Sequence, residues 1–386
     1  MIGLTGGLGI YISQSFGAQD YGKMRQETAM SVLICLGIGV VVTILSLLAM
    51  RPLFTFLNTP QDMMKDTISY FRIILIGSTV TVCNNFAMTL LRCVGNSRVP
   101  LIAMILSSII NVILDVLFVF PGKMGVSGAA LATVLAQVIV TMIMLFGVIL
   151  QKKENVLKGL RLFVKIPLEY VQGICKIGIP TALQGMVYCF ISMVLTRMVA
   201  GFGPEAIATQ RVGGQIESIS WNTADGFGAA MNAFIGQNYG AGKTERVKKG
   251  YRASLCTVGI WGILITLVFV VVPVPIASVF FHEKTAIATA VDYLIIVGYS
   301  EAFLCVELMT VGALSGLGRT RLCSVISIVF TSLRIPLAII LSSGVLGILG
   351  IWWALTTTTM MKGIIFTCAF FIIMRKMTDA QRTDII

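Results

Sequence analysis

Long apolar runs separated by short polar connections follow one another along the chain. Many runs reach about 20 residues, the length that an α-helix needs to cross the hydrocarbon core of a bilayer. An all-α membrane protein is therefore the expected fold class. The predicted spans are 1–16 (partial), 28–50, 66–91, 99–120, 126–150, 174–200, 206–236, 253–272, 286–314, 322–342 and 347–374.

Positions 223 residues apart match at corresponding connections between these runs. One offset holds from the first connection to the third without a gap, which indicates an internal repeat. Because the matching basic connections lie on the same side, the two units are parallel repeats, an arrangement found in secondary transporters. The matching segments are 12–18 with 235–241, 91–98 with 314–321 and, after a slip of one residue, 125–128 with 347–350.

The repeat predicts two six-helix bundles joined by a linker. The expected parts are an N-terminal bundle over 1–150, a cytoplasmic linker over 151–173 and a C-terminal bundle over 174–386. Residue 1 corresponds to residue 224, which lies midway along the second helix of the second unit. We therefore expect an N-terminally truncated chain, with about 11 of the 12 spans of the parent, the first missing and the second partial.

Composition argues against a soluble protein and against an enzyme. Hydrophobic residues make up 56% of the chain and charged residues only 12%, about half the charged fraction of soluble domains. The nine cysteines form no C-x-x-C pair, and there is one histidine, so neither a zinc site nor a hydrolase-type triad is indicated. We expect no catalytic residue and no cofactor.

The net charge of +12 reflects membrane topology. One set of alternate connections carries most of the lysines and arginines. The other set carries only Arg51, Lys65, Lys123 and Lys284. This positive-inside asymmetry predicts a multi-pass cell (inner) membrane protein whose connections at 16–27, 151–173 and 237–252 and whose C-terminus are cytoplasmic. Nucleic-acid binding is not expected.

A carboxylate inside the predicted span 99–120 is the clearest candidate for function. Burying a charge in a membrane span costs about 2.5–3.5 kcal/mol on insertion scales, so such residues are usually functional. Asn111 lies one helical turn before Asp115, on the same face, and Thr133 on the next span presents a hydroxyl. These oxygens suit Na⁺, and the carboxylate could instead carry H⁺. The alternative is a structural hydrogen bond between helices.

The second unit has acidic residues in two of its predicted spans. Lining a cavity, they would attract organic cations, which aromatic side chains such as Tyr188 would stack against. The alternative is that Glu217 and Glu307 pair with the embedded bases Arg211, Arg334 or Lys362. The four acidic residues are Glu217, Asp225, Glu301 and Glu307.

Several of these segments together resemble the multidrug and toxic compound extrusion (MATE) family. The resemblance implies export of cationic amphiphilic compounds in exchange for inward H⁺ or Na⁺ by alternating access. It also places a cation site at Asn111, Asp115, Thr133 and the carbonyl region of Ala129. The segments that carry it are 12–18, 235–241, 91–98, 312–320 and Gly178-Ile-Pro180.

Some members of that family have a glutamate in the seventh helix, and this chain departs from the pattern. The corresponding position is Tyr188, or Gln184 one turn earlier. The expected substrate cavity therefore combines these two side chains with the four acidic residues. The partners expected are cationic small molecules and the lipid bilayer, and we expect a monomer.

Two other functions remain open from the sequence. A flippase for an isoprenoid-linked saccharide, built on a related fold, should carry a cluster of bases deep in its cavity. A channel or a receptor without transport activity should show no ion-coupled efflux. An ATP-driven pump is disfavoured, because the phosphate-loop pattern would require glycine at position 237, which is Gln237.

Overall fold

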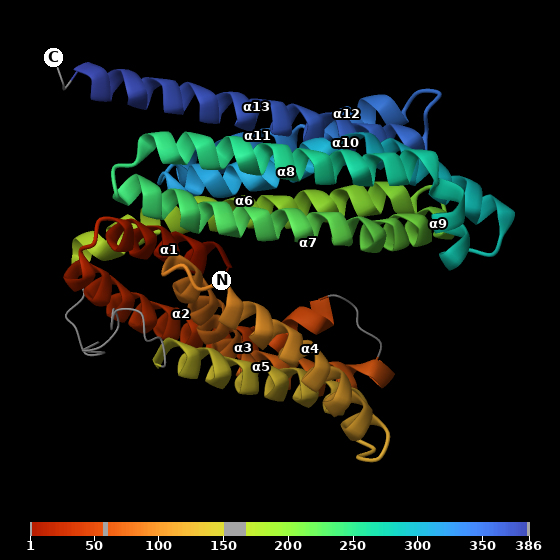
Figure 1. The fold of residues 1–386 in the computed structure, drawn as a ribbon. Helices are drawn as coiled ribbons and strands as arrows, with labels where there is room; N and C mark the ends of the chain where they lie inside the picture. Colours follow the sequence, from red (N-terminus) through yellow and green to blue (C-terminus); the bar gives the residue numbers. More distant parts are fainter. Residues whose placement is uncertain (1, 57–60, 150–166, 384–386) are drawn as a thin grey trace. The chain divides into compact units, whose positions relative to one another are not determined.

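The computed structural model describes residues 2–56, 61–149 and 167–383, and these residues are almost entirely α-helical (Figure 1). No strand occurs in the described ranges. The helices are α1 (Ile2–Gly17), α2 (Tyr21–Phe56), α3 (Gln61–Cys93), α4 (Arg98–Val119), α5 (Gly125–Ile149), α6 (Leu168–Ala200), α7 (Pro204–Gly240), α8 (Thr244–Val271), α9 (Pro273–Phe280), α10 (Lys284–Gly316), α11 (Thr320–Ser332), α12 (Arg334–Ser342) and α13 (Ile348–Thr383).

The chain divides into two compact units, Met1–Ile174 and Cys175–Ile386. Each has its own apolar core. Leu8, Val82 and Phe86 belong to a core cluster of unit 1, and Tyr251, Met309 and Phe366 belong to one of unit 2. Most of the predicted linker, 151–166, lies outside the described residues. Its last residues are helical, because α6 already begins at Leu168.

Several helices extend beyond the apolar runs that predicted them. The connection predicted over 237–252 is largely helical, because α7 continues to Gly240 and α8 begins at Thr244. Hydropathy detects only the segment inside the hydrocarbon layer, whereas Lys, Arg and Glu are good helix formers and continue a helix beyond it. The basic residues of this region therefore lie on the first turns of α8.

The single span predicted over 322–342 is interrupted. Helix α11 ends at Ser332 and α12 begins at Arg334. Pro336 explains the break, because proline has no amide hydrogen and its ring collides with the carbonyl of the residue four positions earlier, here Ser332. The hydropathy of the run contains no sign of this break.

The internal repeat is visible in the backbone of the turns. Gly95 and Gly318, 223 positions apart, have positive φ angles of 81° and 77°. Gln19 and Gly242 are also 223 positions apart and have φ angles of 59° and 69°. A left-handed residue just past a helix end is a common helix C-cap. The same cap therefore ends corresponding helices in the two units.

The hydrogen bonds of these caps also correspond. The amide of Asn96 donates to the carbonyl of Leu91 at 2.9 Å, and the amide of Arg319 donates to the carbonyl of Leu314 at 2.9 Å. This bond across five residues is the mark of a Schellman cap. Because backbone conformation and hydrogen bonds recur together, the repeat predicted from sequence is confirmed at these turns.

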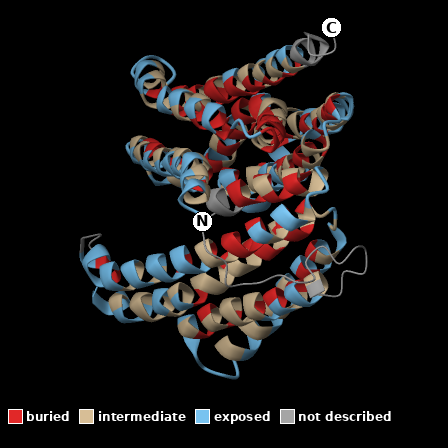
Figure 2. Cartoon of the chain, turned by 90° about the vertical axis from the view of Figure 1, so that its left-hand side faces the viewer, coloured by how far each residue is buried: buried red, intermediate tan, exposed pale blue. Residues whose placement is uncertain are grey.

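Large apolar side chains cover the outer surfaces of many helices. Figure 2 shows intermediate and exposed positions along the length of the helices and not only at their ends. Leu48 on α2, Val112 on α4 and Ile260 on α8 are 73%, 62% and 69% exposed. Such surfaces are unfavourable in water and suit lipid.

Nine helical segments of the described chain meet the length and hydropathy of a membrane span. Helices α1 and α7 are not among them. Helix α7 is long enough, with 37 residues, and its sequence includes several polar side chains that lower its hydropathy. These include Gln210, Gln215, Glu217 and Asp225.

Glycines bring α7 and α10 into backbone contact in unit 2. A methyl group on Gly312 would collide with the carbonyl group of Gly228, and one on Gly316 would lie 2.6 Å from the carbonyl oxygen of Asn232. Small residues four positions apart allow such close approach between membrane helices. This contact sets the position of the glutamates carried by both helices.

Candidate cation and substrate sites

In unit 1, the side chains predicted to bind a cation meet between α4 and α5. Asn111 Nδ2 on α4 donates to Thr133 Oγ1 on α5 at 3.4 Å. The Thr133 hydroxyl in turn donates to the carbonyl oxygen of Ala129, one turn earlier on α5, at 3.0 Å. The structure thus brings together three of the four predicted residues through direct contacts.

Asp115 lies one turn beyond Asn111 on α4. Its Oδ1 atom is shielded from solvent and has no hydrogen-bond partner within the described part of the chain. Buried polar oxygens are rarely left unpaired, because an oxygen that loses its hydration without gaining a new hydrogen bond destabilises the fold by about 1–3 kcal/mol. A proton or a metal cation at this oxygen would remove that cost.

The oxygens of the four predicted residues are of the hard type that alkali and alkaline-earth cations prefer. They come from one carboxylate, one amide, one hydroxyl and one backbone carbonyl. A single formal negative charge favours a monovalent cation over a divalent one. Among the described residues, no group of three or more His, Cys, Asp or Glu side chains forms a metal-binding cluster.

Neutral polar contacts continue along the α3–α5 interface in unit 1. Thr81 on α3 donates to Gln137 on α5, one turn after Thr133. The hydroxyls of Ser69 on α3 and Ser127 on α5 lie 2.8 Å apart. These contacts are not recognisable from the sequence, because uncharged hydroxyl and amide groups are common in membrane helices and do not stand out without the helix pairing.

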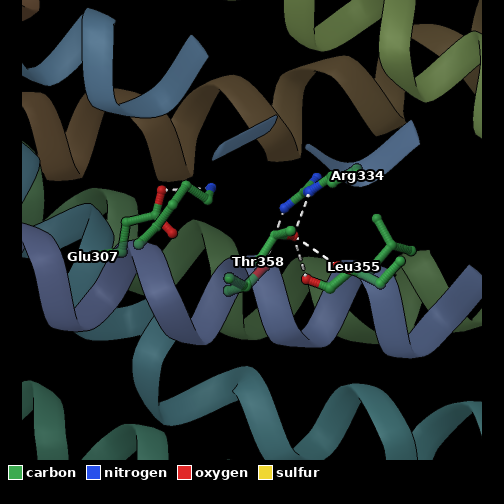
Figure 3. A network of polar contacts seen from close by, with 7 residues as sticks. Glu307, Arg334, Leu355 and Thr358 are labelled. Atoms are coloured by element: carbon green, nitrogen blue, oxygen red, sulfur yellow. Dashed lines mark hydrogen bonds and ion pairs between the residues drawn. The ribbon is translucent and has the colours of Figure 1, made fainter. Parts of the chain in front are cut away.

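In unit 2, Glu307 on α10 forms a buried ion pair with Lys362 on α13. Lys362 Nζ lies 2.7 Å from Glu307 Oε1, and the two residues are 5% and 6% exposed. Figure 3 shows Glu307 within this polar network. The pairing is the alternative raised for Glu307 above, and it neutralises the carboxylate in this conformation.

A second buried base, Arg334, is bound by hydroxyls of α13. Its Nε atom donates to Thr358 Oγ1 at 3.1 Å, and Nη2 donates to Thr359 Oγ1 at 3.0 Å. Thr358 also donates to the carbonyl oxygens of Ala354 and Leu355, so the hydroxyl is held in place (Figure 3). Arg334 begins α12, directly after the break beside Pro336.

Two further glutamates of unit 2 have different surroundings. Glu217 on α7 accepts a hydrogen bond from the Tyr293 hydroxyl on α10. Glu301 on α10 is 0% exposed, and neither of its carboxylate oxygens makes a hydrogen bond of ordinary geometry to a described residue. In this conformation Glu301 is closed to ligands, although it lies on the helix that carries Glu307.

The other three residues predicted to line the substrate cavity are more accessible. Tyr188 on α6 is 55% exposed, Asp225 on α7 is exposed and Gln184 is half-buried. The six residues thus form two groups, one of partly or fully buried glutamates on α7 and α10 and one of accessible polar side chains.

Comparison with known proteins gives a consistent relationship. The chain is similar to a probable multidrug resistance protein NorM of Thermotoga maritima, 26% identical over 365 residues that cover 91% of this chain and 76% of the relative. It is also similar to the multidrug export protein MepA of Staphylococcus saprophyticus, 23% identical over 90% of this chain and 76% of the relative.

Solved structures have the same fold. A crystal structure of a MATE protein in the bent conformation superposes with a TM-score of 0.89 and 21% identity, over 98% of this chain and 84% of that chain. The profile of the MatE family matches residues 1–117 and 180–340. Together with the membrane-length helices, these matches show that the chain belongs to the MatE family, whose members are transporters and not enzymes.

Proposed function

We propose that this protein exports cationic amphiphilic compounds by antiport with H⁺ or Na⁺, through alternating access. Its relatives are named multidrug resistance and export proteins. The observation that carries the coupling part is the buried Asp115 oxygen, which has no hydrogen-bond partner among the described residues, one helical turn from Asn111 and its contact with Thr133. A buried oxygen that lacks a hydrogen-bond partner is stabilised when a cation binds to it.

Cation binding would act on the packing of α4 against α5. The oxygens of the site come from both helices, so a bound cation favours the helix arrangement in which they converge. A ligand shifts a conformational equilibrium only through its different affinity for the two states. Export then requires the cation to favour the state that binds the drug weakly.

Substrate recognition is assigned to unit 2. Tyr188, Gln184 and Asp225 are accessible, and a cation can stack on an aromatic ring and be attracted by a carboxylate. Glu217, Glu301 and Glu307 would join the cavity only after a rearrangement that exposes them. The basic connections support a place in the cell membrane with a cytoplasmic C-terminus. We expect the protein to act as a monomer.

The ion pair in unit 2 favours export over saccharide-lipid flipping. A flippase needs free bases to hold a pyrophosphate group. Lys362 is neutralised by Glu307. The other buried base, Arg334, is bound by two threonine hydroxyls, and the nearby helices add two more glutamates, Glu217 and Glu301. The buried charges therefore do not form an anion site in this conformation.

Everted membrane vesicles that contain the protein test the proposal. Uptake of a cationic dye such as ethidium is followed under an imposed Na⁺ gradient, an imposed pH gradient, or neither. We expect uptake driven by one of the two gradients and abolished by its ionophore. Dye uptake that does not depend on either gradient would contradict coupled antiport. A lack of dye uptake, while the purified protein still binds the dye, would contradict it as well.

A further inference from the structure

A cavity of about 350 Å³ lies between the first turns of α8 and the last turns of α13 in unit 2. Both segments are at the same end of this unit (Figure 1). Three of its seven lining residues are basic, and none is acidic. The lining consists of Lys248, Tyr251, Arg252, Phe370, Phe371, Met374 and Arg375.

Aromatic side chains form a rigid floor for this cavity. Tyr251 is fully buried and stacks on Phe370, with ring centroids 3.6 Å apart and ring planes inclined by 16°. The Tyr251 hydroxyl lies 2.9 Å from the Thr310 hydroxyl on α10. Phe371, at the rim, is 42% exposed. The cavity therefore combines a fixed apolar base with an accessible apolar edge.

The positive charge of the cavity is only partly compensated. Lys248 Nζ pairs with Glu245 at 2.9 Å, and the Glu245 side chain is mostly exposed. Neither Arg252 nor Arg375 forms an ion pair within the part of the chain that the structure describes. Two guanidinium groups thus border one cavity, and neither is paired with a carboxylate of the described residues.

The surroundings of the cavity place it where a span leaves the hydrocarbon layer. Ile260 on α8 and Ile364 on α13, about two to three turns further into their spans, are 69% and 52% exposed. Apolar surface of this kind faces lipid tails, whereas the basic ends of the same helices lie at the level of the headgroups.

We propose that this cavity binds the phosphate-containing headgroup of an anionic phospholipid. Guanidinium groups form strong, paired hydrogen bonds to phosphate oxygens, and basic pockets between membrane helices attract anionic headgroups. The acyl chains lie along the exposed side of α13 past Phe371. A free phosphate ion would leave this apolar edge uncovered, which favours the lipid as the occupant.

A lipid in this position bridges α8 and α13. It stabilises unit 2 by contacting both helices, and it makes the stability of the transporter depend on membrane composition. The inference rests on the cavity and on membrane insertion, and it is independent of the coupling ion and of the exported compound.

The test measures thermal unfolding of the purified, delipidated protein in detergent after addition of phosphatidylglycerol, phosphatidylcholine or inorganic phosphate. We expect phosphatidylglycerol alone to raise the Tm. The double variant Arg252→Gln/Arg375→Gln should bind phosphatidylglycerol at least about tenfold more weakly, since each base near an anionic surface contributes about 1 kcal/mol.

Two further variants make the result specific. Arg246→Gln/Lys249→Gln removes the same charge from the neighbouring cavity at residues 242–249 and should keep the response. Arg252→Lys/Arg375→Lys keeps the charge and should keep part of the Tm response to phosphatidylglycerol. This variant provides the test if the Gln variant is unstable. An equal Tm rise with phosphatidylcholine, an equal rise with phosphate, or a full response in both Arg252/Arg375 variants would overturn the proposal.

Discussion

Lys362 on α13 and Glu307 on α10 are held together by an ion pair of 2.7 Å between atoms almost inaccessible to solvent. Their helices also pack through apolar side chains, including Phe366 and Met309 of the main core cluster of unit 2. The two charges are mutually dependent, because either one alone would be buried without compensation. This pair supports a test of stability that is separate from transport.

Removing one member of the pair should destabilise unit 2 more than removing both. Glu307→Gln or Lys362→Met alone should cost about 3–5 kcal/mol, because it leaves an uncompensated buried charge. The double variant should recover much of this loss, since apolar or neutral replacements of a whole buried pair are often tolerated. Thermal unfolding of the four proteins in detergent forms the double-mutant cycle. Additive losses would show that the two groups act independently.

Gly312 should not tolerate any side chain. Gly312→Ala places a methyl group against the backbone of Gly228 and should destabilise the protein by about 1–3 kcal/mol through overpacking. Gly226→Ala on the partner helix α7 is the matched control, because no atom lies within 4 Å of the added methyl group. The control should leave the Tm unchanged or raise it. Equal effects of both variants would contradict the close α7–α10 contact.

Asp115→Asn should abolish dye efflux and leave the amount of protein in the membrane unchanged. Asparagine keeps the size of the side chain but removes its negative charge, so the site can no longer hold H⁺ or Na⁺. Ser108→Ala, an exposed position on the same helix whose hydroxyl donates to the Met104 carbonyl, should transport normally. Efflux that persists in Asp115→Asn would exclude this residue from coupling.

The left-handed backbone conformation at Gly95 should make this position sensitive to the addition of a side chain. Gly95→Ala should cost about 1–2 kcal/mol, because a Cβ atom disfavours positive φ, although nothing lies within 4 Å of the new methyl group. Gly95→Asn should cost less, since asparagine adopts this conformation more readily. Gly37→Ala, at a helical position with equally open surroundings, is the control. A loss in Gly37→Ala as large as that in Gly95→Ala would argue against a conformational cause.

Much of the unit 1 site was predictable, because it depends on short-range spacing. Asn111 and Asp115 share a helix face by virtue of being four residues apart, and Thr133 lies on the next helix along the chain. In unit 2, the decisive contacts join residues 55 positions apart, as in Glu307–Lys362, or 76 apart, as in Glu217–Tyr293. No sequence period links such residues, so the sequence could only name their possible partners.

The sequence alone determined that this is a helical membrane protein with an internal repeat. The long apolar runs follow directly from exposure to lipid, and the repeated residues follow from left-handed helix caps that recur in both units. Only the tertiary structure decided the states of the buried charges. Glu307 is paired and Glu217 is bound by a tyrosine. Among the described residues, an oxygen of Asp115 and both oxygens of Glu301 make no hydrogen bond of ordinary geometry. The reason is physical, since the energy of a buried charge depends on atoms a few ångströms away, which packing between distant helices supplies.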